Sequence, residues 1–200
     1  YIFQIINTNK YSQSFLIFRG KIGHGQSWLS QQFILEGLNQ SQHCLLLSFE
    51  PFLKDHCSPI IINDNQQPFF HFFNAANWTN IQSRSWRNLD FIYDQLCDIC
   101  EYSNIQRIVI DSICHGIPFW STQSIVSFID LCRSLPNNKN QCIVWTFNTH
   151  SSIQELEYHL CNMMNISISL TKNSDDGILS TIDFSKSQSY NSSPVTIQPN

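Results

Sequence analysis

A glycine-rich stretch near the start of the chain has the spacing of a phosphate-binding loop. The pattern for such a loop is Gly, four residues, Gly, Lys and then Ser or Thr. Gly20, Gly25 and Ser27 are in register with it, whereas Gln26 stands in the place of the lysine. Backbone N–H groups of such a loop, and of the helix that follows it, can hold an anion. The sequence therefore predicts a nucleotide site made of Gly20, Gly23, Gly25, Gln26 and Ser27 that lacks its principal charge.

The glutamine changes what this site can do. The amide of Gln26 donates neutral hydrogen bonds, but it cannot neutralise the charge that develops between phosphates during hydrolysis. Loss of a charge-assisted contact costs about 1.5–3 kcal/mol, and more where the charge develops in the reaction itself. Lys21 lies in the same loop and is the cation that could substitute. We therefore predict a degenerate site without efficient hydrolysis, with no catalytic residue, no bound cofactor and no metal.

Polar residues that follow other apolar runs could complete such a site. Asp111 follows Ile-Val-Ile and is placed like the aspartate that helps to hold magnesium, although Arg107 at the start of the run makes the match imperfect. Glu50 ends another apolar run, where RecA-type ATPases carry the carboxylate that activates water. Thr146 and His150 end a further run, where such enzymes often place a polar sensor. These positions occur in the expected order along the chain.

Other candidates for chemistry are isolated in the sequence. Cys97 and Cys100 have a CxxC spacing, but no second pair accompanies them, so we predict neither a zinc nor a redox site. Seven of the eight cysteines lie in strand-like or helix-like segments and are interpreted as small buried hydrophobic residues of an intracellular protein. The remaining histidines lack metal-ligand spacing: His24, His43, His56, His71, His115 and His159. The basic residues outside the loop are expected to be solvated charges or interface groups: Arg84, Arg87, Arg107, Arg133 and Lys139.

Strand-like and helix-like segments alternate along most of the chain. This alternation predicts an α/β fold with a mainly parallel central sheet flanked by helices. The predicted strands are 15–19, 43–49, 69–73, 107–111 and 142–146, and the predicted helices are 27–39, 86–102, 122–135 and 152–163. Ser121 or Thr122 is expected to cap the third of these helices. The Phe-rich strand 69–73 is expected to belong to the core rather than to stack on bases.

The pattern changes toward the end of the chain. Segments 166–170 and 178–184 are predicted to form an antiparallel hairpin through the turn-rich residues 173–177. Residues 185–200 are rich in Ser, Asn, Gln and Pro and are predicted to be a loose polar tail. Residues 1–184 are therefore expected to form one domain.

Composition excludes several classes of protein. A hydrophobic fraction of 42% is too high for a disordered chain. The formal net charge of −4 gives no global positive field that would attract nucleic acid. The apolar runs are much shorter than the roughly 20 residues that a membrane-spanning helix needs. We therefore expect no membrane partner.

Taken together, these segments resemble the RecA-like subunits of the Elongator complex, most closely the fifth. A P-loop without its lysine and an aspartate-serine pair at the end of the central strand are the shared features. The resemblance extends over residues 12–184 and is carried by segments 15–19, 45–50, 70–78 and 108–113. The block His-Phe-Phe-Asn-Ala-Ala-Asn-Trp, residues 71–78, is its most distinctive part. The sixth subunit is a close rival because segment 125–132 resembles its corresponding helix.

The resemblance implies a function that composition alone does not. The fourth, fifth and sixth subunits assemble into a heterohexameric ring that joins the catalytic subcomplex and helps to handle tRNA, whose wobble uridine the complex modifies. The chemistry resides in another subunit, so this chain would be a non-catalytic RecA-like subunit, a pseudo-ATPase, in the cytoplasm and also the nucleus. Two features depart from the pattern: the loop is closer to a working P-loop than expected for the fifth subunit, and the acidic tail of some members is absent.

In RecA-like rings the loops after the central strands face the pore. Here those loops would be 112–121 and 148–153, which contain His115 and His150 but neither Lys nor Arg. Phosphate affinity grows with the number of cationic contacts. The chain alone should therefore contribute little tRNA affinity, and its partners would supply most of the charge.

Two other functions fit the same residues. The first is a divergent RecA-type ATPase, related to recombinase paralogues or to circadian-clock ATPases. The second is a small intracellular RecA-like module that binds some other protein. Residue 26 discriminates between the ATPase and the ring subunit, because only the ATPase requires strong nucleotide binding.

Overall fold

The computed structural model describes residues 13–50, 60–75, 88–135, 141–150, 153–171, 180–184 and 195–197. Strands and helices alternate through most of these residues. In chain order the elements are β1 (Gln13–Gly20), α2 (Gln26–Asn39), β2 (Cys44–Ser48), η1 (Gln67–Phe69), β3 (Phe70–Asn74), α3 (Leu89–Ser103), β4 (Arg107–Asp111), η4 (Ile113–Gly116), α4 (Thr122–Cys132), β5 (Gln141–Asn148), α5 (Gln154–Met163), β6 (Ile166–Leu170), β7 (Ser180–Phe184) and β8 (Val195–Ile197).

The strands form one sheet in the order β3-β2-β4-β5-β1-β6-β7-β8. From β3 to β6 in this order, each pair of adjacent strands is parallel. Parallel strands need crossover connections, and helices provide most of them here. The predicted α/β fold with a parallel central sheet is thus confirmed, and the architecture is consistent with a Rossmann-like or P-loop-like fold.

The C-terminal strands are antiparallel. β7 pairs with β6, where Ile168 lies opposite Phe184, and β8 pairs with β7. The turn that would make β6 and β7 a hairpin, residues 172–179, lies outside the described residues, so the hairpin stays a prediction. The predicted polar tail, 185–200, contains β8, and its other residues lie outside the described part of the chain.

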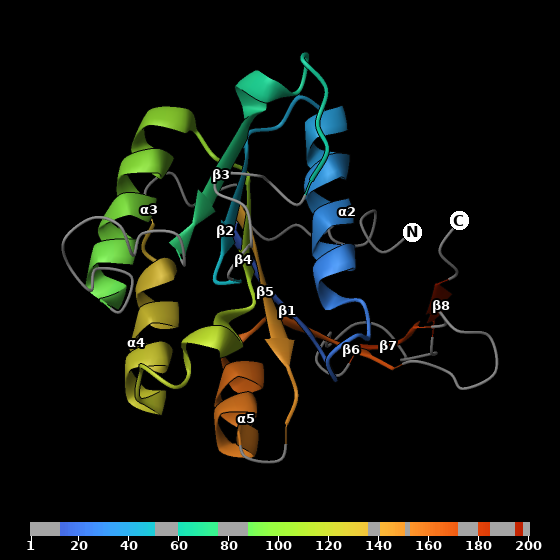
Figure 1. Cartoon of the computed structure of the whole chain (residues 1–200), viewed down its shortest axis with the longest axis vertical. Helices are drawn as coiled ribbons and strands as arrows, with labels where there is room; N and C mark the ends of the chain where they lie inside the picture. The colour runs from blue at the N-terminus through green and yellow to red at the C-terminus, as the bar shows by residue number, and fades with distance from the viewer. Residues whose placement is uncertain are drawn as a thin grey trace.

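Helices cover both faces of the sheet (Figure 1). Side chains alternate between the two faces of a strand, and β1 shows how the two cores arise. Phe15 and Ile17 belong to a hydrophobic cluster with α3, α4 and α5, whereas Leu16 and Phe18 belong to a second cluster with α2. Because the middle of β1 is buried on both sides, residues 15–18 are continuously apolar, as in parallel central strands.

Side-chain caps determine where two of the helices begin. Ser121 caps α4, because its Oγ accepts a hydrogen bond from the Ser124 N–H at 3.1 Å. Asn88 caps α3 by accepting from the Asp90 N–H at 3.0 Å. The prediction of a cap at Ser121 or Thr122 is confirmed. In the described residues α3 begins at Leu89, and residues 86 and 87 of the predicted helix lie outside them.

The prediction for Arg107 is wrong, because the side chain is buried with only 2% exposed. Its Nε donates to Gln42 Oε1 at 2.6 Å and its Nη1 donates to Phe33 O at 2.8 Å. The guanidinium also lies 4.6 Å from the centre of the Phe33 ring. A Cβ on Gly37 would come within 2.6 Å of Arg107 Cδ, so only glycine leaves room for this arrangement. Burial lowers the pKa of Arg107.

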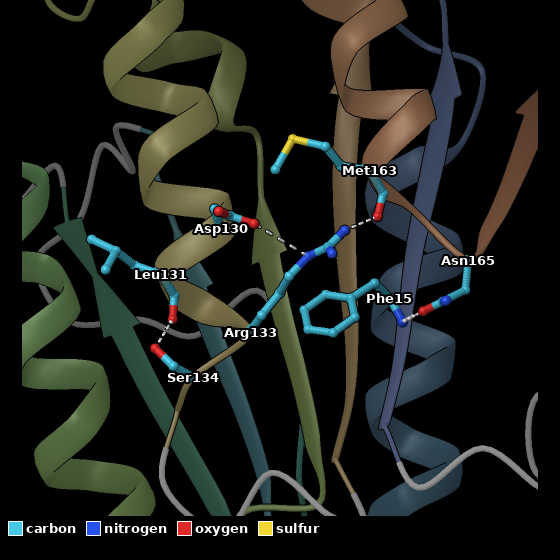
Figure 2. Close-up of polar contacts among 7 residues, drawn as sticks. All are labelled: Phe15, Asp130, Leu131, Arg133, Ser134, Met163 and Asn165. Atoms are coloured by element: carbon cyan, nitrogen blue, oxygen red, sulfur yellow. Dashed lines mark hydrogen bonds and ion pairs between the residues drawn. The ribbon is translucent and has the colours of Figure 1, made fainter.

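Arg133 also has a structural role near Phe15, at the start of β1. Figure 2 shows its polar contacts. Its guanidinium lies 5.2 Å from the centre of the Phe15 ring and donates to the carbonyl of Met163. It also lies 3.7 Å from a carboxylate oxygen of Asp130. Beside it, Asn165 Oδ1 accepts from the Phe15 N–H at 2.8 Å. These contacts tie the ends of α4 and α5 to the first strand.

Candidate functional site

The three glycines of the predicted loop each meet a separate backbone requirement. Gly23 and Gly25 have φ angles of 83° and 93°, in the left-handed region that favours glycine. Gly20 is needed for space, because a Cβ there would lie 2.6 Å from Leu170 O and 3.0 Å from Gln26 Nε2. The register read from the sequence thus corresponds to a tightly turned loop between β1 and α2.

The start of α2 carries backbone N–H donors where the loop joins the helix. Gly25 is the residue before the helix, and no side chain makes a capping hydrogen bond to the first turn. The first N–H groups of a helix have no partners within the helix, so they favour an anion or water there. The start of α2 therefore offers backbone donors that could hold an anion.

Gln26 is directed back into the loop. The side chain is 3% exposed, and its Nε2 donates to Lys21 O at 3.0 Å. The amide that replaces the lysine is thus used to close the loop on itself, and it brings no charge. Lys21 is exposed at the edge of the loop, so the cation is displaced from the position that the motif assigns to it.

Ser27, Asp111 and Thr146 meet at one oxygen atom. Ser27 Oγ donates to Asp111 Oδ1 at 3.1 Å, and Thr146 Oγ1 donates to the same oxygen at 2.5 Å. Thr146 Oγ1 in turn accepts from the Ser112 N–H at 2.7 Å. The first turn of α2, the end of β4 and β5 thus each supply one of the first three residues. That these residues form a nucleotide site stays a prediction.

Burial dominates the electrostatics of Asp111, which is 3% exposed. Desolvation raises the pKa of this carboxyl, and the negative charge of Glu50 raises it further. The hydrogen bonds from Thr146 and Ser27, and the charge of His115, act in the opposite direction. An aspartate in this environment would gain from a bound cation, since a cation stabilises the charged form that burial disfavours.

Glu50 lies close enough to Asp111 for its negative charge to raise the pKa of the Asp111 carboxyl. Its N–H donates to Ser48 Oγ at 3.1 Å, and its carbonyl accepts from Asn74 Nδ2 at 3.3 Å. The Phe49 N–H beside it donates to Asp111 O at 3.0 Å. These contacts hold the end of β2 against the end of β4, as the order of the motifs predicts.

Beside the loop, the connections that leave the neighbouring strands β1 and β5 run toward opposite edges of the sheet. The chain leaves β1 toward β2 on one side, and leaves β5 toward β6 on the other. In open α/β sheets, ligands bind in the crevice outside the carboxyl ends of the strands at such a point. A groove of about 550 Å³ lies there, lined by Lys21, Ile22, Thr149, His150, Gln154 and Glu157. Thr149 N donates to Gly20 O at 2.8 Å, which fixes the groove against the loop.

The structure separates His150 from the other predicted sensor. Thr146 bonds Asp111, whereas His150 lines the groove with Lys21. Sequence reasoning missed Ser112, whose φ of 62° places a residue other than glycine in the left-handed region. Its strained backbone directs the N–H to Thr146, and strain of this kind is common at functional sites. An aspartate-serine pair after a strand is the only trace of this in the sequence.

The cysteines and histidines show no sign of a competing site in the described part of the chain. All seven cysteines within it are free, and burial raises the pKa of Cys44 and Cys100 to about 12, far from a reactive thiolate. No group of three or more His, Cys, Asp or Glu in the described ranges could hold a metal ion.

None of the helices in the described ranges has the length and apolar character needed to cross a membrane.

Comparison with known proteins identifies no family for this chain. The chain matches no protein-family model, and it has no significant match among curated proteins.

Proposed function

We propose that this chain is a non-catalytic RecA-like subunit, a pseudo-ATPase, of the accessory ring of Elongator. In this role it supports modification of the tRNA wobble uridine through assembly and tRNA handling. The fourth and sixth subunits would be its partners in a heterohexamer, and the catalytic subcomplex would bind the ring. The proposal combines the motif resemblance with the geometry of the loop.

The observation that carries the pseudo-ATPase part is the position of Gln26. Its amide is buried and bonded to the loop carbonyl of Lys21 at 3.0 Å. In a working loop a lysine would reach the outer phosphates from this position, and its charge would be available in the transition state. The hydrogen bonds of Ser27 and Thr146 to Asp111 support this proposal, since these residues would be the remaining polar groups of a nucleotide site without that charge.

Two observations support the assembly part. Two large apolar side chains are exposed in and directly after the loop: Ile22 is 81% exposed and Trp28 is 43% exposed. A neighbouring subunit in a ring would cover them and remove their apolar surface from water. Among the residues lining the groove, Lys21 supplies the only Lys or Arg side chain, so tRNA affinity would come mainly from the partners.

Residue 26 gives the test of the nucleotide site. We expect the wild-type chain to hydrolyse no ATP and the Gln26→Lys variant to bind ATP about 10- to 100-fold more tightly than wild type, the equivalent of one charge-assisted contact. Isothermal titration calorimetry with Mg-ATP measures the affinity, and phosphate release measures turnover.

Gln26→Met is the matched control, because it has a similar length and no charge. It should not improve ATP binding. Micromolar binding with turnover by the wild type would contradict the pseudo-ATPase and favour a divergent RecA-type ATPase.

Co-expression tests the ring. We expect the full chain, produced with the fourth and sixth subunits, to elute as one complex whose mass by native mass spectrometry is that of two copies of each subunit. The chain produced alone should self-associate, because its ring surfaces would be exposed. A well-behaved monomer that ignores both partners would overturn the Elongator assignment, whatever the ATP result.

A further inference from the structure

Two histidines meet at the edge of the parallel sheet, far from the glycine-rich loop in sequence. His71 lies in β3, the first strand in the sheet order, and His43 directly precedes β2. Their rings are stacked, with centroids 6.2 Å apart and planes inclined by 30°. The strand register explains the meeting, because His71 is opposite Leu45, two residues after His43 on the same face.

Both rings carry a buried nitrogen without a hydrogen-bond partner. The atoms are Nδ1 of His43 and Nε2 of His71. Phe69 packs edge-on against His43, with centroids 5.1 Å apart, so the surroundings are apolar. A neutral imidazole tolerates such a position, since one ring nitrogen carries no proton. An imidazolium does not, because its second N–H would be buried as a charged donor without an acceptor.

We propose that His43 and His71, the histidine pair, form an acid-sensitive contact that holds the edge strand β3 on the sheet while His71 is neutral and releases it when His71 is protonated. β3 is held mainly through β2 within the described residues. A second positive charge on the stacked ring would add repulsion to the loss of burial. Release would uncover the edge of β2, whose residues Cys44–Ser48 are all buried.

The groups around His71 disfavour its protonated form in the closed state. Burial lowers the pKa of His71 below its ordinary value, and the charge of His43 lowers it further. Phe69 of η1 is apolar. His71 lies on the face of the sheet that α3 covers, like its register partner Leu45. The acidic side chains of α3, Asp90, Asp94, Asp98 and Glu101, are nevertheless not among the charges that act on His71. No carboxylate in the described part of the chain therefore offsets a proton on this ring.

The sign of the pH effect follows from the lowered pKa. Between the pKa of the folded state and the ordinary value of 6.5, the released state binds more protons than the closed one. The contact therefore has its full strength above pH 6.5 and weakens as the pH falls through 6.5. Below the pKa of His71 in the folded state it weakens no further. The equilibrium for release changes about tenfold for each pH unit within that window.

Residue-level amide hydrogen exchange on the full chain tests the proposal. We expect protection of β3 to fall between about pH 7.5 and about pH 5, around the ordinary histidine pKa, after correction for intrinsic exchange. Protection of the central strands β4 and β5 should not follow it. His71→Gln should abolish the pH dependence, and His43→Gln should reduce it. His159→Gln, an exposed site on α5, is the matched control and should leave the profile unchanged.

Three results would overturn the proposal. One is protection of β3 that tracks the central strands at every pH. Another is the same loss of protection in His71→Gln as in the wild type. The third is an NMR titration in which the His71 ring of the wild-type protein has a pKa at or above the ordinary histidine value. The titration needs no variant, so it decides the matter even if His71→Gln fails to fold.

Discussion

Replacing Thr146 with valine is expected to lower the free energy of unfolding by about 2–5 kcal/mol, although the two side chains have nearly the same shape. The Thr146 hydroxyl donates to Asp111 Oδ1 and accepts from the Ser112 N–H, and all three residues are buried. Valine would leave a buried carboxylate with one donor fewer and a buried backbone N–H with no acceptor. Each loss costs about 1–3 kcal/mol, and more for the charged group. Urea denaturation followed by circular dichroism measures the change.

Thr146→Ser separates the hydroxyl from the packing of the methyl group. Serine keeps both hydrogen bonds and removes one methyl, so its cost should be about 1 kcal/mol. A second comparison uses Asp111→Asn as the background, because the amide removes the charge. Thr146→Val should cost less there than in the wild type. Equal costs for valine and serine in the wild-type chain would show that the hydroxyl is not holding the site together.

Replacing Trp145 with alanine should lower the free energy of unfolding by about 3–5 kcal/mol. Trp145 is 1% exposed in the middle of β5 and packs edge-to-face on Phe128, with ring centroids 5.9 Å apart. It lies opposite Ile17 of β1 and Ile110 of β4, so the cavity would open beside the two strands that carry the site. Chemical denaturation and thermal melting measure the loss.

Trp145→Phe is the informative control for this position. The indole Nε1 is buried without a hydrogen-bond partner. Phenylalanine removes some apolar surface, but it also removes an unsatisfied donor that costs about 1–3 kcal/mol. We expect the two effects largely to cancel. If phenylalanine proved as costly as alanine, the indole N–H would have to be bonded in solution, and the packing argument would fail.

Much of the fold could be predicted from local signals. Runs such as Leu45-Leu46-Leu47 are long enough for a buried strand and too short for a helix, and the polar residues after them indicate strand ends. The glycines of the loop could be recognised because positive φ angles strongly favour this residue type. Ser121 was recognisable as a helix cap for an equally local reason.

The candidate site could be predicted only in part. Asp111 and Ser27 are 84 residues apart, and the local sequence around each residue does not indicate that they are in contact. Their contact requires the order of the strands, in which β5 lies between β1 and β4 and places Thr146 beside Asp111. Sequence reasoning treated Thr146 as a sensor at a strand end and did not anticipate that it also bonds the strained backbone of Ser112.

Arg107 shows most clearly what long-range structure decides. By residue type it should be solvated, because burying a guanidinium is costly. The cavity that accepts it is built by Gly37, Phe33 and Gln42, which come from α2 and from the segment after it. The histidine pair is similar, since His43 and His71 stack only because β2 and β3 pair in one particular register.

The alternation of strands and helices, the glycine loop and the glutamine in place of its lysine can be read from local sequence, because each depends on residue type and short-range spacing. The final positions of the charged and polar groups depend instead on the packing of distant segments. The tertiary structure directed Gln26 onto Lys21 O, joined Ser27 and Thr146 at Asp111, and buried Arg107. The physical reason is that desolvation and hydrogen bonding depend on neighbours in space, which strand order and register set.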